Sequence, residues 1–502
     1  MATDAPSAGT TPQAPSLLRS GALSLVTSAA PLVVALVALP ILTRQLGAER
    51  LGLLALAWAW LSYAALLDFG LGRALTRIVA ASDAGQSIEA PIGALVATAH
   101  RLLAVVGLVV AIAGAVLAPW YVSHVLVVSD ALRRDAIAGA VIFALSVPLI
   151  TASSVPRAVL EARQQFRAVN IVRLPVSIAT FAVPLVLLPL TTSLTVIAIV
   201  LGALRAWAWW RYASLARTLL AAGSADAPSR THLRPLLRAG AWMTISNVLS
   251  PLMTVADRFV IGSLVSVSAV ALYAVPWEAV TKLWIVPGAL TMVLFPAIAR
   301  AAASEPRQLI PLHAASVRLL TLIVAPVCSV ACLLAPWLLR LAGGAQYGGD
   351  SVDVLRILAI GVAANCVATV PFTLLQACGR ARWTATLHLL EVIPFGLALW
   401  FGVSRWGIVG AAVAWTARVL LDAILMAWRA QSIAPLPAWN LLLNAAGVLA
   451  VAACALLGRL RPDASATALG IALAIAAVLP FILWNRRSLD ERLVLERVGG
   501  RQ

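Results

Sequence analysis

The sequence predicts an all-α polytopic membrane protein with about 14 transmembrane helices, from its composition, its length and its recurring apolar segments. Of the 502 residues, 62% are hydrophobic and only 11% are charged, and the mean hydropathy is +0.95. A soluble domain is roughly half apolar and about a quarter charged, so a soluble fold could not bury this much apolar surface. A helical span needs about 20 residues, so short connections leave room for on the order of 14 spans.

Apolar segments recur along the whole chain between short polar stretches. In the first half they occupy 20–42, 51–79, 92–118, 136–160, 170–190 and 193–212. In the second half they occupy 239–263, 268–296, 312–337, 351–376, 384–403, 407–429, 439–458 and 466–485. The polar stretch 213–238 separates the two series and predicts a connection between two halves.

A short repeat indicates that the two halves are similar. Leu18-Arg-Ser-Gly-Ala22 opens the first span, and Leu237-Arg-Ala-Gly-Ala241 opens the seventh. Six spans return a chain to its starting side, so the second six helices would run parallel to the first six, as in several secondary transporters. The predicted organisation is a disordered tail (1–17), a six-helix lobe (18–212), a cytoplasmic connection (213–238), a second six-helix lobe (239–430), a helix pair (431–485) and a basic tail (486–502).

The distribution of arginine predicts the orientation. The net charge is +17, and Lys282 is the only lysine. If the N-terminus is cytoplasmic and the spans alternate, most basic residues fall on the inner side, densest near 157–173, 211–238 and 486–501. The positive-inside rule therefore places both termini in the cytoplasm. In such a chain the positive charge indicates orientation and contact with anionic lipid, and it does not indicate a nucleic-acid partner.

Several classes of chemistry are not supported by the sequence. The five cysteines have neither disulfide-framework nor metal-knuckle spacing, and the five histidines form no recognisable metal motif. No phosphate-binding G-x-x-x-x-G-K-[ST] motif is present. We therefore expect no metal, no cofactor and no catalytic residues. A membrane enzyme, such as a sugar polymerase or an acyltransferase, is the alternative class, but the longest predicted outer loop, about 119–135, holds no catalytic grouping.

Ionisable residues inside the apolar segments are the candidate functional residues. Each costs about 2.5–3.5 kcal/mol at the bilayer centre, so together they must face one another or an aqueous cavity. The candidates for substrate binding are Arg101, Arg258, Lys282, Arg318 and Arg356. The candidates for coupling or gating are Asp68, Asp257, Glu278, Glu391, Arg418 and Asp422.

Helical spacing suggests partners for some of these charges. Glu278 and Lys282 share a helix face at i,i+4, as do Arg418 and Asp422. Such pairs either work in transport or only neutralise each other and lock helices together. We expect Pro276 to open the backbone near Glu278. Arginines without an acid at i±4 suit a diphosphate, which guanidinium binds through two hydrogen bonds, although Arg101 and Arg318 could equally snorkel to the interface.

Four stretches resemble the oligosaccharide flippases of bacterial polysaccharide biosynthesis, within the multidrug/oligosaccharidyl-lipid/polysaccharide exporter superfamily. The resemblance covers roughly residues 18–430. The four stretches are Pro40-Ile-Leu-Thr-Arg-Gln-Leu-Gly47 with Leu51-Gly-Leu53, Leu67-Asp-Phe-Gly-Leu-Gly-Arg-Ala-Leu-Thr-Arg77, Ala256-Asp-Arg-Phe-Val-Ile-Gly262 with Leu272-Tyr-Ala-Val-Pro276, and Trp284-Ile-Val-Pro-Gly-Ala-Leu-Thr-Met-Val-Leu-Phe-Pro296.

This resemblance implies alternating access between two lobes in the bacterial cytoplasmic membrane. The implied substrate is an undecaprenyl-diphosphate-linked glycan, with membrane lipids as partners. The resemblance leaves open H+ or Na+ as the coupling ion and a polysaccharide polymerase or assembly protein as a further partner. The alternative within the superfamily is a multidrug or cation exporter, which should have a cavity dominated by carboxylates. The excess of basic over acidic residues inside the spans favours an anionic substrate.

Overall fold

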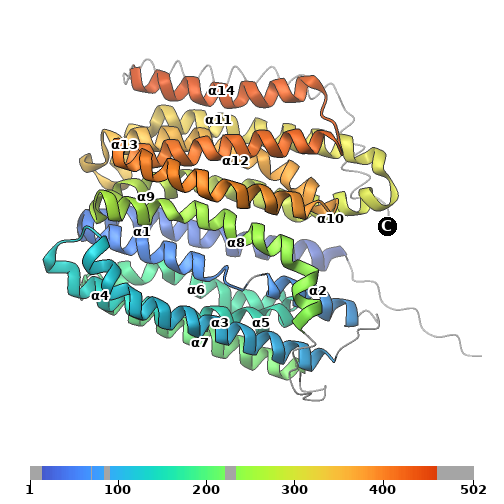
Figure 1. Ribbon diagram of the computed structural model, residues 1–502, viewed down its shortest axis with the longest axis horizontal. Helices are drawn as coiled ribbons and strands as arrows, with labels where there is room; N and C mark the ends of the chain where they lie inside the picture. Colours follow the sequence, from blue (N-terminus) through green and yellow to red (C-terminus); the bar gives the residue numbers. More distant parts are fainter. Residues whose placement is uncertain (1–13, 69, 84–90, 221–232, 461–502) are drawn as a thin grey trace, which may run out of the picture.

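The computed structural model describes residues 14–68, 70–83, 91–220 and 233–460, and these ranges are α-helical with short connections (Figure 1). Within them, nine helical segments are long and apolar enough to cross a membrane. The predicted all-α polytopic class is confirmed, whereas the count of 14 spans stays a prediction. Residues 1–13 of the predicted tail (1–17), residues 221–232 of the predicted connection (213–238), the last span at 466–485 and the basic tail at 486–502 lie outside the described residues. Residues 14–17 of the predicted disordered tail are helical, as the start of α1.

The helices follow one another in the order expected from the apolar segments. They are α1 (Ala14–Ala64), α2 (Leu71–Asp83), α3 (Ile92–Trp120), α4 (Asp130–Leu145), α5 (Val147–Ala162), α6 (Phe166–Leu187), α7 (Leu194–Leu220), α8 (Leu233–Leu264), α9 (Val267–Thr281), α10 (Ile285–Ser304), α11 (Leu309–Gly343), α12 (Asp350–Ala377), α13 (Ala381–Gln431) and α14 (Ala438–Leu460). Short helical turns lie at Tyr121–Val125, Lys282–Trp284, Pro306–Gln308 and Ala345–Tyr347.

Two of the helices turn back on themselves at a glycine. The 51 residues of α1 and the 51 residues of α13 would each extend roughly 75 Å if straight, far more than the bilayer core of about 30 Å. The backbone breaks at Gly47, where φ is 77°, and at Gly407, where φ is 54°. Only glycine adopts such positive φ values without a steric penalty. Each long helix is therefore a hairpin of two antiparallel halves, as the paired apolar segments predicted.

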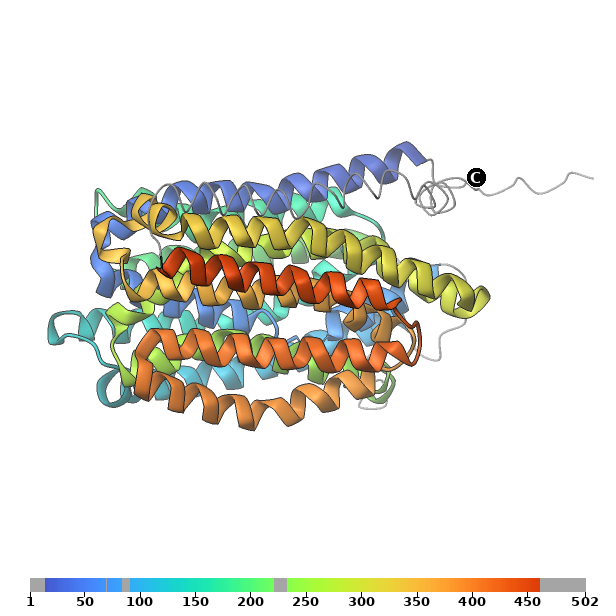
Figure 2. The same ribbon diagram turned by 90° about the horizontal axis from the view of Figure 1, so that it is seen from above.

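The helices form two groups that meet along α1, α8 and α9. In the first group α1 packs on α6, α3 on α4 and α5, and α7 on α4 and α5. In the second group α12 packs on α13, α11 on α12, and α8 on α13 (Figure 1). Helix α14 lies along α11 (Figure 2), at the edge of this group (Figure 1). This arrangement agrees with a two-lobe organisation, although the residue boundaries of the lobes stay a prediction.

The segment expected as one span at 51–79 is divided in the structure. Helix α1 ends at Ala64, and α2 starts at Leu71 after a turn in which Gly70 has a φ of 71°. The carboxylate of Asp68 accepts a hydrogen bond from the backbone N–H of Gly70 at 3.0 Å. An aspartate that binds the backbone two residues on is typical of turns. Asp68 therefore shapes the end of a helix.

Proline residues free backbone carbonyls that neighbouring helices then bind. A proline has no N–H to donate to the carbonyl four residues before it. Pro184 leaves the carbonyl of Thr180 without its helical partner, and this carbonyl accepts a hydrogen bond of 3.1 Å from Nε1 of Trp58. Pro276 likewise leaves the carbonyl of Leu272 free, and this carbonyl accepts a hydrogen bond of 3.0 Å from Oγ of Ser351. In a bilayer such carbonyls find no water, so these contacts hold helices together.

The expectation that Pro276 opens the backbone near Glu278 is wrong. Helix α9 continues to Thr281, and the irregular turn follows at Lys282–Trp284. The contact from Ser351 accounts for the intact helix at Pro276, because it satisfies the freed carbonyl.

The two helix groups are joined at the end of the bundle that holds the α3–α4 and α8–α9 loops. The N–H of Val127 donates to the carbonyl of Gly262, and the N–H of Val267 donates to the carbonyl of Val127, both at 3.0 Å. We call Val127, Gly262 and Val267 the clasp, and this end of the bundle the clasp end. The opposite end, which holds α2 and the start of α8, is called the α2 end.

The clasp end requires a close approach of the two helix groups at Gly52. A Cβ at this position would overlap the backbone carbonyl of Val267. We therefore expect Gly52→Ala to lower the free energy of unfolding by about 1–3 kcal/mol, the usual cost of overpacking. Gly202→Ala is the control, because a Cβ there meets no atom within 4 Å. Thermal unfolding of the purified protein measures both, and an equal midpoint for the two variants would contradict the close approach.

Candidate transport site

The predicted pair Glu278–Lys282 lies at the junction of the two helix groups and includes a third charge. Nζ of Lys282 is 2.5 Å from one carboxylate oxygen of Glu278. Nη2 of Arg258, on α8, is 3.4 Å from the other oxygen. We call Arg258, Glu278 and Lys282 the α9 trio. Two cations share one carboxylate, so the trio carries one net positive charge.

Asp257 finds its partners on a different side of α8 from Arg258. Its carboxylate accepts a hydrogen bond of 2.5 Å from the hydroxyl of Tyr273 and one of 2.7 Å from the N–H of Arg258. Asp257 and Tyr273 are both fully buried. Adjacent residues on a helix point in different directions, so Asp257 and Arg258 each pair with α9 separately. Asp257 thereby fixes α8 against α9 and leaves the Arg258 guanidinium to Glu278.

Aromatic rings surround the α9 trio and connect it to the first helix group. The Arg258 guanidinium lies 5.7 Å from the ring centre of Trp277, which packs at 4.8 Å against Trp415. The Lys282 ammonium lies 5.4 Å from the ring centre of Phe181 on α6. A cation over an aromatic face is attracted by the ring quadrupole. Lys282 is therefore a contact between the two groups, and it is the most exposed member of the trio.

A second group of charges lies within the α13 hairpin. Nε of Arg418 is 3.9 Å from a carboxylate oxygen of Glu391, and Nε2 of His388 is 3.7 Å from Oδ1 of Asp422. We call His388, Glu391, Arg418 and Asp422 the α13 cluster. All four are at least nine-tenths buried. The hairpin at Gly407 brings the two halves together, so Arg418 pairs with Glu391 and not, as spacing suggested, with Asp422.

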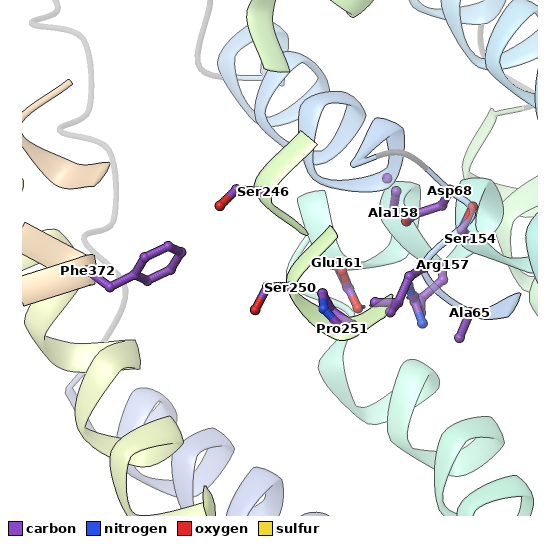
Figure 3. Close-up of a pocket in the computed structure, with 12 residues that line it drawn as sticks. Ala65, Asp68, Ser154, Arg157, Ala158, Glu161, Ser246, Ser250, Pro251 and Phe372 are labelled. Atoms are coloured by element: carbon purple, nitrogen blue, oxygen red, sulfur yellow. Dashed lines mark ion pairs between the residues drawn. The ribbon is translucent and has the colours of Figure 1, made fainter. Parts of the chain in front are cut away.

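A cavity of about 440 Å³ separates the two helix groups towards the α2 end (Figure 3). The first group contributes Asp68, Ser154, and the ion pair between Nε of Arg157 and Glu161 at 3.7 Å. The second group contributes Ser246, Ser250, Pro251 and Phe372. Sequence reasoning placed Asp68 among the coupling residues but did not single out Arg157, Glu161 or Ser246.

The remaining predicted substrate residues lie apart from the α9 trio. Arg101 is exposed on α3. The Arg318 guanidinium lies 5.6 Å from the ring centre of Trp439 on α14. Arg356 is buried between α11, α12 and α14. The structure therefore brings together two of the five predicted basic residues, Arg258 and Lys282.

Arg356 holds three elements together at the clasp end. Its Nε donates to the carbonyl of Cys332 at 3.3 Å, its Nη2 donates to the carbonyl of Gly458, and its Nη1 is 3.6 Å from Asp353. The Cys332 carbonyl is the one left free by Pro336. Arg356 thus satisfies a free backbone carbonyl of α11 and holds the end of α14 in place.

His388 is the buried residue that sequence reasoning missed most clearly. It lies three residues before Glu391 on the same helix, a spacing that places both side chains on one face. Its other partners, Ser246 and Asp422, come from α8 and from the far half of α13. Only the spacing from Glu391 could have been found from the sequence, because the other contacts depend on tertiary packing.

The fold, with its long apolar helices and buried charge groups, is that of a multi-pass membrane protein. A solved structure titled as the lipid II flippase MurJ in an inward closed conformation superposes with a TM-score of 0.69 at 11% identity, covering 94% of this chain and 99% of that one. An inward-facing multidrug resistance MATE family transporter of the MOP superfamily gives a TM-score of 0.66 at 16% identity, covering 81% and 95%. At these identities the likeness concerns the fold alone.

The sequence family follows from a more specific match. Residues 41–353 match the family described as polysaccharide biosynthesis protein. The chain belongs to this family. It is also similar to a putative O-antigen transporter of Shigella flexneri, at 28% identity over 413 residues, which cover 82% of this chain and 97% of the relative. These relatives are transporters, in agreement with the expectation that this chain is a transporter and not an enzyme.

The contacts of Arg356 predict that this residue stabilises the folded protein and does not bind substrate. Arg356→Gln should lower the free energy of unfolding by about 1.5–3 kcal/mol, because it removes charge-assisted hydrogen bonds to buried carbonyls. Arg101→Gln, at an exposed position, is the control and should leave stability unchanged. Denaturant unfolding of both purified variants measures the effect. Normal stability of Arg356→Gln combined with lost transport would instead assign Arg356 to the substrate path.

Proposed function

We propose that the protein moves an undecaprenyl-diphosphate-linked oligosaccharide from the inner to the outer leaflet of the bacterial cytoplasmic membrane by alternating access. Membership of the polysaccharide biosynthesis family and the likeness of the fold to a lipid flippase support a lipid-linked sugar as the class of substrate. The observation that carries the proposal is the α9 trio, in which two cations share one carboxylate where the helix groups meet. The orientation comes from the positive-inside rule, which makes the α2 end cytoplasmic.

The α9 trio has the chemistry to hold a diphosphate. A guanidinium binds phosphate oxygens through two parallel hydrogen bonds, and an ammonium adds a compact charge. In the absence of substrate the Glu278 carboxylate is paired with both Arg258 and Lys282, so an arriving diphosphate would displace it. The aromatic rings around the trio keep this exchange out of bulk water, where such contacts would be weak.

In this proposal the cavity is the inner entrance to the site. Its walls come from both helix groups, so it would widen or close as the groups rotate against each other. The clasp joins the same groups at the other end and would have to break for release to the outer leaflet. Asp68 and the remaining coupling candidates, Asp257, Glu391, Arg418 and Asp422, belong to the elements that would move.

Export of a cationic compound is the second candidate function. It is favoured by the cavity lining, in which Asp68 and Glu161 outnumber Arg157. However, Glu161 is paired with Arg157, and Asp68 is bound to the turn at Gly70. The two candidates predict opposite effects of removing positive charge from the α9 trio, because a cationic substrate would be repelled by it.

Removing either cation should reduce transport without preventing folding. In Arg258→Ala and in Lys282→Ala, Glu278 keeps one cationic partner, so both variants should reach near-normal membrane levels. Transport should fall roughly tenfold to a hundredfold, the equivalent of losing one or two charge-assisted hydrogen bonds. Complementation of a strain that lacks the gene measures this through the lipid-linked glycan that accumulates on the cytoplasmic face. Arg101→Ala is the control.

Two outcomes would contradict the assignment. If both variants fail to insert, the trio is only a structural ion pair. If both reach the membrane and restore full transport, the diphosphate binds elsewhere.

Glu278 should link substrate binding to proton uptake. A diphosphate that takes over Arg258 and Lys282 leaves the Glu278 carboxylate without cations, which favours its protonation, and linkage makes this coupling reciprocal. Glu278→Gln should therefore flatten the dependence of transport on pH, whereas the exposed Glu305→Gln should not. Flipping in proteoliposomes across a pH series measures this effect. An unchanged pH profile at normal abundance would remove Glu278 from coupling.

A further inference from the structure

The α13 cluster holds more acid than base in a buried part of the second helix group. Glu391 and Asp422 are both buried, and among the side chains that the structure describes Arg418 is the one guanidinium that faces them. From the helices packed against α13, the described side chains that reach the cluster are the neutral Ser246 of α8 and Phe372 of α12. With both carboxylates ionised and His388 neutral, the cluster would carry one uncompensated negative charge.

The polar atoms of the cluster also lack hydrogen-bond partners. Among the described residues, neither carboxylate oxygen of Glu391 has one, nor do Oδ1 of Asp422 and two nitrogens of Arg418. Burial of an unbalanced and unpaired charge is strongly unfavourable. One added proton, held between the two acids, makes the cluster neutral and supplies a donor for the orphaned oxygens.

His388 connects this cluster to the cavity between the helix groups. Its Nδ1 is 2.6 Å from Oγ of Ser246, and its ring stacks on Phe372 with ring centres 6.1 Å apart. Ser246 and Phe372 both line the cavity (Figure 3). On its other side, Nε2 of His388 is 3.7 Å from Oδ1 of Asp422. One imidazole thus separates the buried acids from the cavity wall.

We propose that Ser246 and His388 form a proton relay, and that the α13 cluster is a proton-binding site open to the α2-end cavity in this conformation. This inference rests on the proposed function, to which it adds a second proton-binding site besides Glu278, together with the route by which the proton reaches it. His388 and Ser246 act as positioning and relay residues between the cavity and the buried acids. The titratable groups on the far wall of the cavity are Asp68, Arg157 and Glu161.

The relay conserves protons at each step. A protonated Asp422 gives its proton to Nε2 of His388, the Nδ1–H gives its proton to Oγ of Ser246, and the hydroxyl proton of Ser246 passes to water in the cavity. The imidazole ends as the other neutral tautomer and returns when the sequence runs in reverse. The separation of 3.7 Å between Nε2 and Oδ1 needs to shorten by about 0.8 Å for a hydrogen bond.

A metal cation is the competing ligand for this cluster. His388, Glu391 and Asp422 each offer one atom, and these atoms lie within 4.8 Å of one another. The Arg418 guanidinium, however, already supplies a positive charge 3.9 Å from Glu391 and would repel a second fixed cation. This favours the proton, and Na+ becomes an outcome of the test.

The relay is tested by following proton binding in the purified full-length protein. After a rapid drop in pH, infrared difference spectroscopy should show a new carboxylic-acid C=O band, which Glu391→Gln or Asp422→Asn removes. His388→Gln keeps a hydrogen bond to Ser246 but cannot pass a proton, so the band should appear about a hundredfold more slowly. Ser246→Ala should have the same effect and keeps the test independent of the folding of His388→Gln.

The matched control is His313→Gln. His313 is also fully buried, but its Nδ1 binds the carbonyl of Ala434 beside α14, away from the cavity lining. This variant should gain the band at the wild-type rate. A wild-type rate in both His388→Gln and Ser246→Ala would overturn the relay. So would the loss of the band on addition of NaCl at constant pH and ionic strength, because the site would then hold Na+.

The two proposals fail in different ways. A wild-type protein that flips a lipid-linked sugar but shows no carboxylic-acid band refutes the relay and leaves the proposed function standing. A protein that shows the band with the expected variant effects, but moves no lipid-linked sugar, supports the relay and refutes the proposed substrate.

Discussion

A charged or polar group that leaves water inside a bilayer must find its partner within the protein, and the architecture of this chain depends on that requirement. It explains why Glu278 is shared by two cations and why Asp257 is bound by Tyr273. It also explains the contacts to carbonyls that proline residues leave free, in which side chains of other helices replace the missing N–H groups. The same interactions that satisfy the polar groups therefore fix which helices lie together.

The α9 trio and the α13 cluster differ in their position relative to the contact between the two helix groups. The α9 trio lies where α8 and α9 meet the first helix group through Phe181, so a change in its charge acts on the contact between groups. The α13 cluster lies inside the second group and reaches the cavity only through His388 and Ser246. In the proposed scheme the diphosphate binds at the α9 trio, and the α13 cluster holds a proton inside the second helix group, where the hairpin at Gly407 brings Glu391 and Arg418 together.

The sequence predicted the membrane class and the interactions within single helices, but not the interactions between helices. Glu278 and Lys282 were paired correctly because i,i+4 neighbours lie on one helix face and no acid from another helix competes for Lys282 among the described residues. The same rule failed for Arg418, whose partner Glu391 lies across the hairpin, and it could not assign Arg356 to the carbonyls of α11 and α14. The intact helix at Pro276 was hidden for the same reason, because the freed carbonyl of Leu272 is bound by Ser351 of α12.

The proposed function requires that the protein recognise the diphosphate of a lipid-linked sugar. The most direct measurement is leaflet transfer in proteoliposomes that contain the purified protein and a fluorescent sugar linked to undecaprenol through either a diphosphate or a monophosphate. We expect the diphosphate form to cross much faster than in protein-free liposomes, and faster than the monophosphate form. Equal transfer of the two lipids, or no transfer of either while a cationic dye is moved, would contradict it.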